Sequence, residues 1–278
     1  DKLESDGDKR QARMIRERLS PAPAALASAQ DAANGFSFSN LPTDGESHLH
    51  TVDVSSPELG RDLLLLSSAV ESRVQEFLAN VRRFDDLARV GAATASRLLT
   101  YGPPGTGKTK LARYVAASLD LPLLTVRCDT LVSSLLGQTS RNLRRVFEYS
   151  QQRPCVLFLD EFDALAGARG NERDIGELQR VVIALLQNID AVPENTIIVA
   201  ATNHDQLLDP AVWRRFSFRL PMTEPDLALR KLLWKQYLEP FSAEGLDVEH
   251  LAKISSGITG ANIEPVSYTH LTLPTICS

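Results

Sequence analysis

Apolar residues follow two different spacings along this chain. From position 97 onward, short apolar runs alternate with longer stretches in which apolar residues recur every three or four positions. The runs have the length of strands, and the stretches between them have the spacing of amphipathic helices. Strands are predicted at Leu98–Tyr101, Leu123–Val126, Val156–Leu159, Ile197–Ala200 and Phe216–Leu220. This alternation predicts an α/β fold in which a five-stranded parallel sheet is covered by helices.

The predicted helices form two groups. Helices are expected within 62–87 and at 108–119, 139–151 and 175–189, before and between the strands. After Pro221 the strand pattern stops, and further helices are expected from about 225 to 238, at 247–255 and from Gly260. The change at Pro221 predicts a boundary between an α/β part and a helical part.

The first 56 residues differ in composition from the rest. A charged stretch at 8–19 is followed by a longer stretch that is rich in Ala, Ser, Pro and Gly. Such a composition buries little apolar surface, so residues 1–56 are predicted to be a polar, partly disordered arm or linker.

The overall composition narrows the class of protein. The formal net charge of −5 and the pI near 5.6 argue against a nucleic-acid partner, because dedicated nucleic-acid binders carry a basic excess. No apolar run approaches the roughly 18 residues of a membrane span. Three cysteines, Cys128, Cys155 and Cys277, are too few for a disulfide framework and predict a reducing, cytoplasmic location.

Residues 102–109 read G-P-P-G-T-G-K-T and match the phosphate-binding pattern G-x-x-x-x-G-K-[ST]. The segment lies between a predicted strand and a predicted helix, where its glycines let backbone N–H groups face a phosphate. Lys108 would add positive charge at the outer phosphates, and the Thr109 hydroxyl would ligate Mg²⁺. The residues predicted to bind nucleotide here are Gly102, Pro103, Pro104, Gly105, Thr106, Gly107, Lys108 and Thr109.

Two adjacent carboxylates follow the predicted strand at 156–159. Asp160 and Glu161 would lie beside the phosphate loop, because the carboxyl ends of parallel strands meet at the same edge of the sheet. Asp160 is predicted to hold Mg²⁺ through water, and Glu161 to act as the general base that polarises the attacking water. A carboxylate base that acts on water favours hydrolysis.

The chain resembles the AAA-type ATPases of the wider AAA+ group. The resemblance extends roughly from Pro57 to Glu264, and its motifs are GPPGTGKT, LFLDEFDALAGAR at 157–169, GELQRVVIALLQNID at 176–190 and IVAATN at 198–203. It implies a three-layer P-loop NTPase domain that binds ATP and Mg²⁺. It also implies that Asn203 positions the attacking water and senses the terminal phosphate.

The same resemblance implies two domains. Residues 57–221 would form the nucleotide-binding domain, and 222–264 the start of an all-helical lid domain. Gly260 and Ala261 resemble the segment that opens a lid helix beside the adenine and ribose. A plain helix N-terminus is the alternative for this pair.

Arg214 and Arg215 lie in LLDPAVWRRF at 207–216, which resembles the AAA segment whose two arginines reach the nucleotide of the next subunit. In the commoner pattern Pro-Gly separates these arginines, so this chain departs from it by a short deletion and resembles a bacterial subgroup with Trp-Arg-Arg-Phe. Arg214 is the preferred arginine finger. A pair of surface arginines is the alternative.

Leu135, Leu136 and Gly137 resemble the central pore loop, in which an aromatic residue commonly stands where this chain has Leu135. The resemblance implies a homo-oligomeric ring, a hexamer, that couples ATP hydrolysis to remodelling or unfolding of a protein client. A protease is one partner that it suggests. The leucine favours an alternative, an ATP-gated switch or adaptor with slow hydrolysis, and a simple loop is the alternative for the segment.

The end of the chain departs from the helical pattern. Pro265 lies where the resemblance expects a helix to continue, and residues 266–275 read VSYTHLTLPT. This string is similar to the translation of a transposase-based sequencing adapter. Residues 265–278 are therefore expected to be a non-native tail and the lid domain to be truncated near Glu264. A genuine β-prone tail is the alternative.

Overall fold

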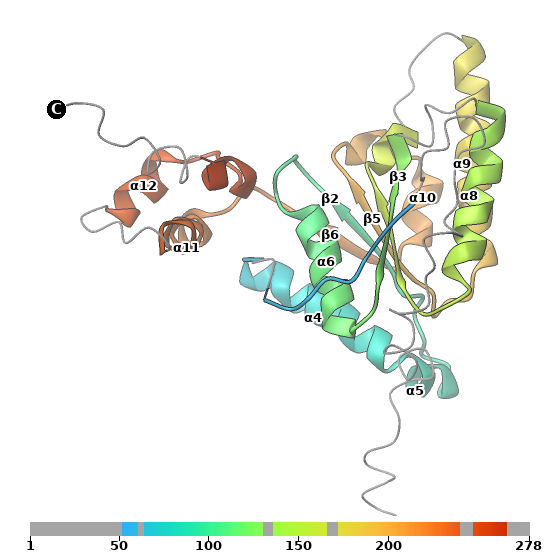
Figure 1. Ribbon diagram of the computed structural model, residues 1–278, viewed down its shortest axis with the longest axis horizontal. Coiled ribbons are helices and arrows are strands. Elements are labelled where there is room, and N and C mark those ends of the chain that lie inside the picture. The colour runs from blue at the N-terminus through green and yellow to red at the C-terminus, as the bar shows by residue number, and fades with distance from the viewer. Residues whose placement is uncertain (1–51, 61–63, 130–135, 166–171, 240–246, 266–278) are drawn as a thin grey trace, which may run out of the picture.

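The structure is a computed structural model. It describes residues 52–60, 64–129, 136–165, 172–239 and 247–265 (Figure 1). Within these ranges, no helix has both the length and the apolar character that a membrane crossing requires.

A six-stranded sheet with the order β1-β3-β4-β5-β2-β6 forms the centre of the protein. Its strands are β1 (Val52–Ser55), β2 (Arg97–Tyr101), β3 (Leu123–Arg127), β4 (Val156–Asp160), β5 (Ile197–Thr202) and β6 (Phe218–Pro221). The neighbouring strands from β3 to β6 pair in parallel, whereas β1 pairs antiparallel with β3. The five predicted strands are present, each within two residues of its expected limits.

The predicted count of five strands is wrong, because β1 adds a sixth. This strand lies inside the range expected to be a polar arm, and its four residues read VDVS. Val52 is fully buried opposite Val126 of β3, and the next residue, Asp53, faces solvent. A stretch this short has too few alternations to be recognised, and its hydrogen-bond partner is more than 60 residues away in sequence.

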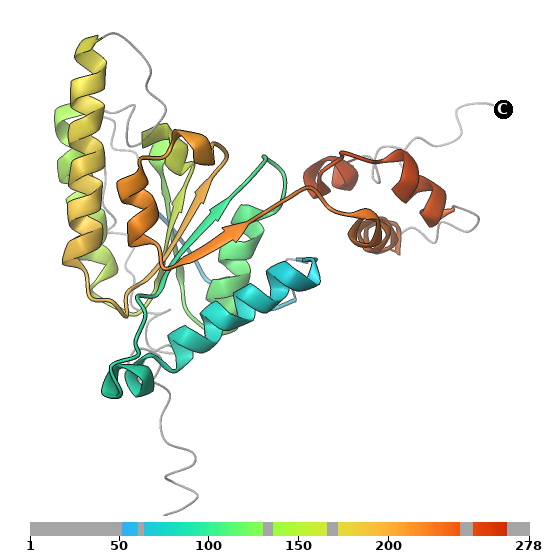
Figure 2. The same ribbon diagram turned by 180° about the vertical axis from the view of Figure 1, so that it is seen from behind.

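Helices cover both faces of the sheet, which gives the three layers expected of the fold (Figures 1 and 2). One face packs against α4 (Ser68–Arg82) and α6 (Lys108–Leu119) through a cluster that includes Phe77, Leu111 and Phe158. The other face packs against α8 (Leu136–Ser150), α9 (Glu172–Ala191) and α10 (Pro210–Arg215). The strands β4 and β5 are buried on both faces, which explains their nearly continuous apolar sequences.

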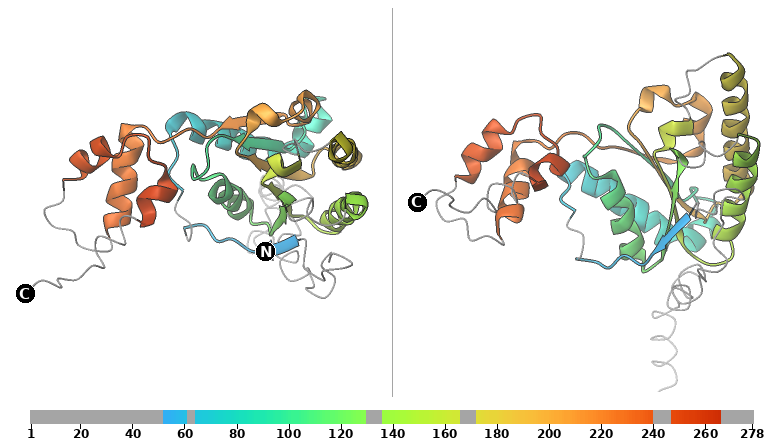
Figure 3. Two further views of the ribbon diagram at one scale, coloured as in Figure 1. Left: turned by 90° about the horizontal axis from the view of Figure 1, so that it is seen from above. Right: turned by 45° about the horizontal axis from the view of Figure 1, so that its top comes forward.

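Short elements connect these layers. They are α5 (Phe84–Arg89) and the 3₁₀ helices η2 (Phe162–Leu165) and η3 (Asp205–Leu207). In the views of Figure 3, the helices of the second face lie well apart from the helices that follow β6.

A separate helical unit follows β6. It consists of α11 (Leu227–Leu238), α12 (Val248–Ile254) and helical residues 260–265, and it lies to one side of the sheet (Figures 1 and 3). The three helices expected after Pro221 are thus present. Asp226 caps α11 by accepting one hydrogen bond from a backbone N–H of the first turn, and Asp247 caps α12 by accepting two. A small core of Leu233, Trp234, Leu238, Ala252 and Ile263 holds the unit together.

Val52→Ala tests whether β1 belongs to the folded domain. Removing two fully buried methyl groups should lower the free energy of unfolding by about 2 kcal/mol, measured by urea denaturation. The neighbouring Asp53→Ala removes an exposed side chain and should change this free energy by less than about 0.5 kcal/mol. Equal effects of the two substitutions would show that β1 does not contribute to the core.

Candidate functional site

The loop between β2 and α6 has the backbone shape of a phosphate cradle. Gly102, Gly105 and Gly107 have φ angles of 139°, 78° and 96°, which residues with a Cβ atom rarely adopt. A Cβ on Gly102 would also lie 2.0 Å from the carbonyl oxygen of Met222, so no other residue fits there without moving the chain. The loop therefore requires glycine both for its curvature and for its contact with the strand end behind it.

Lys108 and Thr109 begin α6, where the first N–H groups of a helix have no partner within the helix. The Lys108 side chain is buried, and its Nζ donates hydrogen bonds to the carbonyl oxygens of Gly102 and Pro103, each at 2.7 Å. Burial lowers the pKa of Lys108, and the nearby carboxylates of Asp160 and Asp163 oppose this effect. The ammonium group is therefore held inside the loop in which it is predicted to bind phosphate.

Asp160 lies at the end of β4, next to Thr109. The Thr109 Oγ1 donates a hydrogen bond to Asp160 Oδ2 at 3.2 Å, and Asp160 Oδ1 accepts one from the backbone N–H of Glu161 at 3.0 Å. A hydroxyl oxygen and a carboxylate held side by side are ligands that suit Mg²⁺, which takes oxygen donors and keeps several waters or phosphate oxygens. The residues present thus fit the predicted magnesium site.

Glu161 has a φ angle of 52°, an uncommon backbone conformation for a residue other than glycine. Burial raises the pKa of its carboxyl group, and the hydrogen bond and negative charge of Asp129 raise it further, whereas Arg127 acts in the opposite direction. Arg127 itself forms an ion pair with Asp129 at 3.2 Å. Glu161 is therefore a carboxyl group whose affinity for a proton has been increased, as a general base requires.

Asn203 follows β5 and lines the same cavity. Asp163, which was not among the predicted site residues, fixes this strand end. Asp163 Oδ1 accepts hydrogen bonds from the Thr202 hydroxyl and from the backbone N–H of Asn203, each at 3.1 Å. Its position three residues after Asp160 in LDEFD is the sequence signal that could have identified it. Thr202 in turn accepts a hydrogen bond from the N–H of His204.

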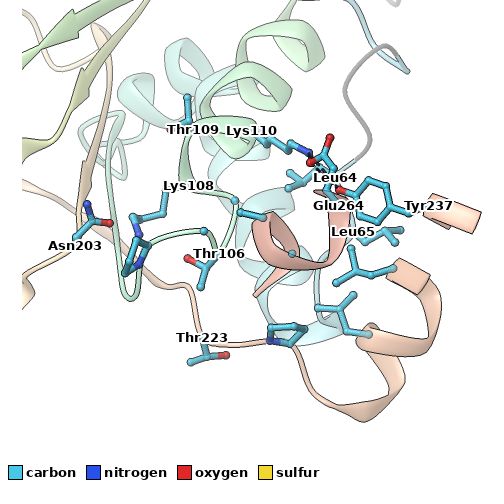
Figure 4. Close-up of a pocket in the computed structure, with 18 of the residues that line it drawn as sticks. Leu64, Leu65, Thr106, Lys108, Thr109, Lys110, Asn203, Thr223, Tyr237 and Glu264 are labelled. Atoms are coloured by element: carbon cyan, nitrogen blue, oxygen red, sulfur yellow. Dashed lines mark hydrogen bonds and ion pairs between the residues drawn. The ribbon is translucent and has the colours of Figure 1, made fainter. Parts of the chain in front are cut away.

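A cavity of about 320 Å³ joins these groups (Figure 4). Residues 104–110 of the phosphate loop and first turn of α6, together with Asp160, Glu161 and Asn203, line its polar end. The predicted loop residues Gly102 and Pro103 are not part of this wall. Its other walls include Leu64, Leu65, Pro225, Leu229 and Leu233. One end thus suits phosphates and a cation, and the other suits a flat apolar group.

Gly260 and Ala261 also line the cavity. The N–H of Ala261 donates a hydrogen bond to the carbonyl oxygen of Gly105 at 3.3 Å. A Cβ on Gly105 would lie 2.5 Å from Oγ1 of Thr259, so the helical unit touches the phosphate loop directly. Other wall residues, Lys110, Tyr237 and Glu264, were missed because no local pattern links positions so distant in sequence.

Among the described residues, the two arginines predicted to act on a neighbouring nucleotide do not line this cavity. Arg215 forms a multiple hydrogen bond with Asp190 of α9, with N–O distances from 2.7 to 3.1 Å, while Arg214 is exposed. Leu135 is outside the described residues. Leu136 and Gly137 open α8.

The three-layer fold and the phosphate loop, with acidic and amide groups at the adjacent strand ends, define the class of P-loop nucleoside triphosphatases. A family model of the "ATPase family associated with various cellular activities (AAA)" matches residues 98–224. The chain is 38% identical over 229 residues to the uncharacterized AAA family ATPase y4kL of Sinorhizobium fredii. The aligned segment covers 82% of this chain and 68% of that protein. The chain belongs to the AAA family of ATPases.

More distant relatives have an additional activity in their names. The chain is 36% identical over 216 residues to the ATP-dependent zinc metalloprotease FtsH of Mycobacterium tuberculosis, covering 74% of this chain and 28% of that protein. It is 34% identical over 237 residues to the ATP-dependent zinc metalloprotease FtsH 1 of Conexibacter woesei, and this alignment covers 81% of this chain and 36% of that protein. The chain thus spans about a third of these proteases.

The raised pKa of Glu161 can be measured directly. In a carboxyl-carbon NMR titration, Glu161 should lose its proton at a pH above the roughly 4.3 of an ordinary glutamate. Asp129→Asn removes a neighbouring negative charge, so the midpoint should shift to lower pH. Asp86→Asn, which removes an exposed carboxylate paired with Arg89 on α5, should leave it unchanged. A normal midpoint in the unmodified chain would contradict this description of the site.

Proposed function

We propose that the chain is a Mg²⁺-dependent ATPase that converts ATP and water to ADP and phosphate. The observation that carries this proposal is the convergence of Lys108, Thr109, Asp160, Glu161 and Asn203 on one cavity, with an apolar wall opposite them. The family relationship supports the same activity, because the relatives described above are named as ATPases or as ATP-dependent enzymes. The apolar wall would receive the base, and the glycine loop the phosphates.

Each polar residue then has a distinct role. The loop N–H groups and Lys108 bind the phosphates, so Lys108 must exchange its carbonyl partners for phosphate oxygens. Thr109 and Asp160 would hold Mg²⁺, which supplies positive charge to the phosphates during cleavage. Glu161 accepts a proton from the attacking water, and Asn203, fixed through Asp163, orients that water.

Glu161→Gln tests the proposed base. The amide keeps the size of the side chain but accepts a proton poorly, so ATP hydrolysis should fall by about 10²–10⁴-fold while ATP affinity stays nearly constant. Phosphate release and equilibrium binding of a fluorescent ATP analogue measure the two quantities. Hydrolysis at the original rate would refute the assignment of Glu161 as the base. A loss of ATP binding would show that Glu161 contributes to binding of ATP and not specifically to its hydrolysis.

We propose Arg214 as the arginine finger, acting on the nucleotide of a neighbouring subunit. Arg215 is held to Asp190 by three nitrogen–oxygen contacts within its own chain and also donates to the carbonyl oxygen of Ala211, so each of its side-chain nitrogens already has an acceptor. Arg214 is exposed at the end of α10, and the residues described here give it no hydrogen bond or ion pair. Arg215 would then anchor α10 so that Arg214 points outward.

Arg214→Ala should lower the turnover of the assembled protein by about 10³-fold or more, since a finger in trans contributes about 10³–10⁵ to the rate. Arg215→Ala should lower turnover far less than Arg214→Ala does, because it loosens the anchor of α10 and leaves the proposed finger present. Mixing Arg214→Ala chains with Lys108→Ala chains should recover part of the activity, because some interfaces then combine an intact loop with an intact finger. Failure of mixed assemblies to recover any activity would argue against action between subunits.

The partners belong to the same proposal. We propose a homo-oligomeric ring, a hexamer, in which hydrolysis drives remodelling or unfolding of a protein client. The FtsH relatives are proteases by name, which supports a protein client and makes a protease a candidate partner. In such a ring the central pore would be faced by Leu135, Leu136 and Gly137. Residues 57–221 would form the nucleotide-binding domain, and residues 222–264 would form the start of its lid. Within the lid, Gly260 and Ala261 would lie beside the sugar and base of the nucleotide.

A slowly hydrolysing switch or adaptor is the second candidate, and the leucine at position 135 favours it over threading. The two differ in how turnover responds to a client. A remodelling enzyme hydrolyses ATP faster when its client is present, whereas a switch assembles with its partner on ATP binding alone. Comparing partner capture by the Glu161→Gln variant with turnover of the unmodified chain separates them.

A further inference from the structure

Three polar side chains on the cavity wall have no part in the phosphate chemistry. Lys110 lies on α6, Tyr237 on α11, and Glu264 in the last helical segment (Figure 4). Lys110 Nζ lies 3.0 Å from Glu264 Oε2 and 3.3 Å from the Tyr237 hydroxyl, and the hydroxyl lies 3.3 Å from Glu264 Oε2. Each member of this trio therefore contacts the other two.

The trio connects the two parts of the protein. Lys110 belongs to the helix that starts in the phosphate loop, whereas Tyr237 and Glu264 belong to the helical unit. The segment 260–265 makes a second contact at its start, where the N–H of Ala261 bonds to Gly105 of the loop at 3.3 Å. This segment thus joins the loop at one end and the first turn of α6 at the other, along the wall of the cavity.

The charges of the trio favour the contact. The Lys110 ammonium group forms an ion pair with the Glu264 carboxylate and also donates a hydrogen bond to the Tyr237 hydroxyl. Burial raises the pKa of Tyr237, which remains a neutral donor. The ammonium group also lies 5.8 Å from the centre of the Tyr237 ring. Lys110 and Glu264 are 36% and 38% exposed, so water screens the pair and it can open.

We propose that Lys110, Tyr237 and Glu264 form a latch that holds the helical unit against α6 and slows the release of bound nucleotide. This inference rests on the proposed function, because it requires a nucleotide in the cavity. Lys110 follows the phosphate- and metal-binding residues Lys108 and Thr109 directly, so the latch is attached to the turn of helix that the phosphates contact. The three are positioning residues that act through the helical unit.

Lys110→Met removes the charge and keeps the length of the side chain. Dissociation of a fluorescent ADP analogue, followed by stopped flow, should become about threefold to tenfold faster, as expected for loss of a half-exposed, charge-assisted contact. Single-turnover hydrolysis should change by less than about twofold, because the Lys110 side chain bonds to Glu264 and Tyr237 and not to the residues assigned to the phosphates, the metal or the attacking water. The matched control is Lys231→Met, which breaks an ion pair of similar exposure with Glu249 inside the helical unit and should alter neither rate.

A charge exchange separates a latch from a direct contact between Lys110 and the nucleotide. Lys110→Glu and Glu264→Lys should each accelerate dissociation, and the double variant should return it to within about twofold of the original rate, because the pair is restored in reverse. Rapid dissociation in the double variant, or an unchanged rate in Lys110→Met, would overturn the latch while leaving the proposed function intact. Failure of the unmodified chain to bind nucleotide would instead overturn the proposed function.

Discussion

The parallel alignment of β2, β5 and β4 is the constraint on which the site depends. Tyr101 lies opposite Thr202, and the N–H of Gly102 donates to the carbonyl oxygen of Thr202 at 3.3 Å, so the phosphate loop and Asn203 leave the sheet together. β4 pairs with the other side of β5 and ends beside them. Groups separated by about 100 positions in sequence therefore meet at one edge, and burial of the central strands keeps the register from slipping.

The sequence predicts most of this edge because its signals are local. Each parallel strand is a short apolar run. The phosphate loop is one continuous segment, and its glycines are needed for the backbone conformation that curves around a phosphate. Asp160, Glu161 and Asn203 follow such runs directly, so predicting the strands also predicted the side chains at their ends. This part of the site needed only the rule that parallel strands present their carboxyl ends together.

Other features depend on partners that no local pattern reveals. β1 is a strand because β3 offers its edge, and its own four residues contain two valines. The different environments of Arg214 and Arg215 arise from Asp190, which reaches Arg215 from the end of α9. Adjacent arginines in a sequence are equivalent until the carboxylate that binds one of them is placed. The wall formed by the helical unit is likewise a product of tertiary packing.

Only a small part of the connection from β6 to the helical unit is free of hydrogen bonds that anchor it at either end. Met222 is fixed at one end, because its N–H donates to the carbonyl oxygen of Tyr101 at 2.7 Å and its own carbonyl oxygen would meet any Cβ at position 102. Pro225 is fixed at the other, because the buried Arg230 of α11 donates to its carbonyl oxygen at 2.6 Å. Only Thr223 and Glu224 remain between these anchors, so any swing of the helical unit must pivot on the backbone torsions of two residues.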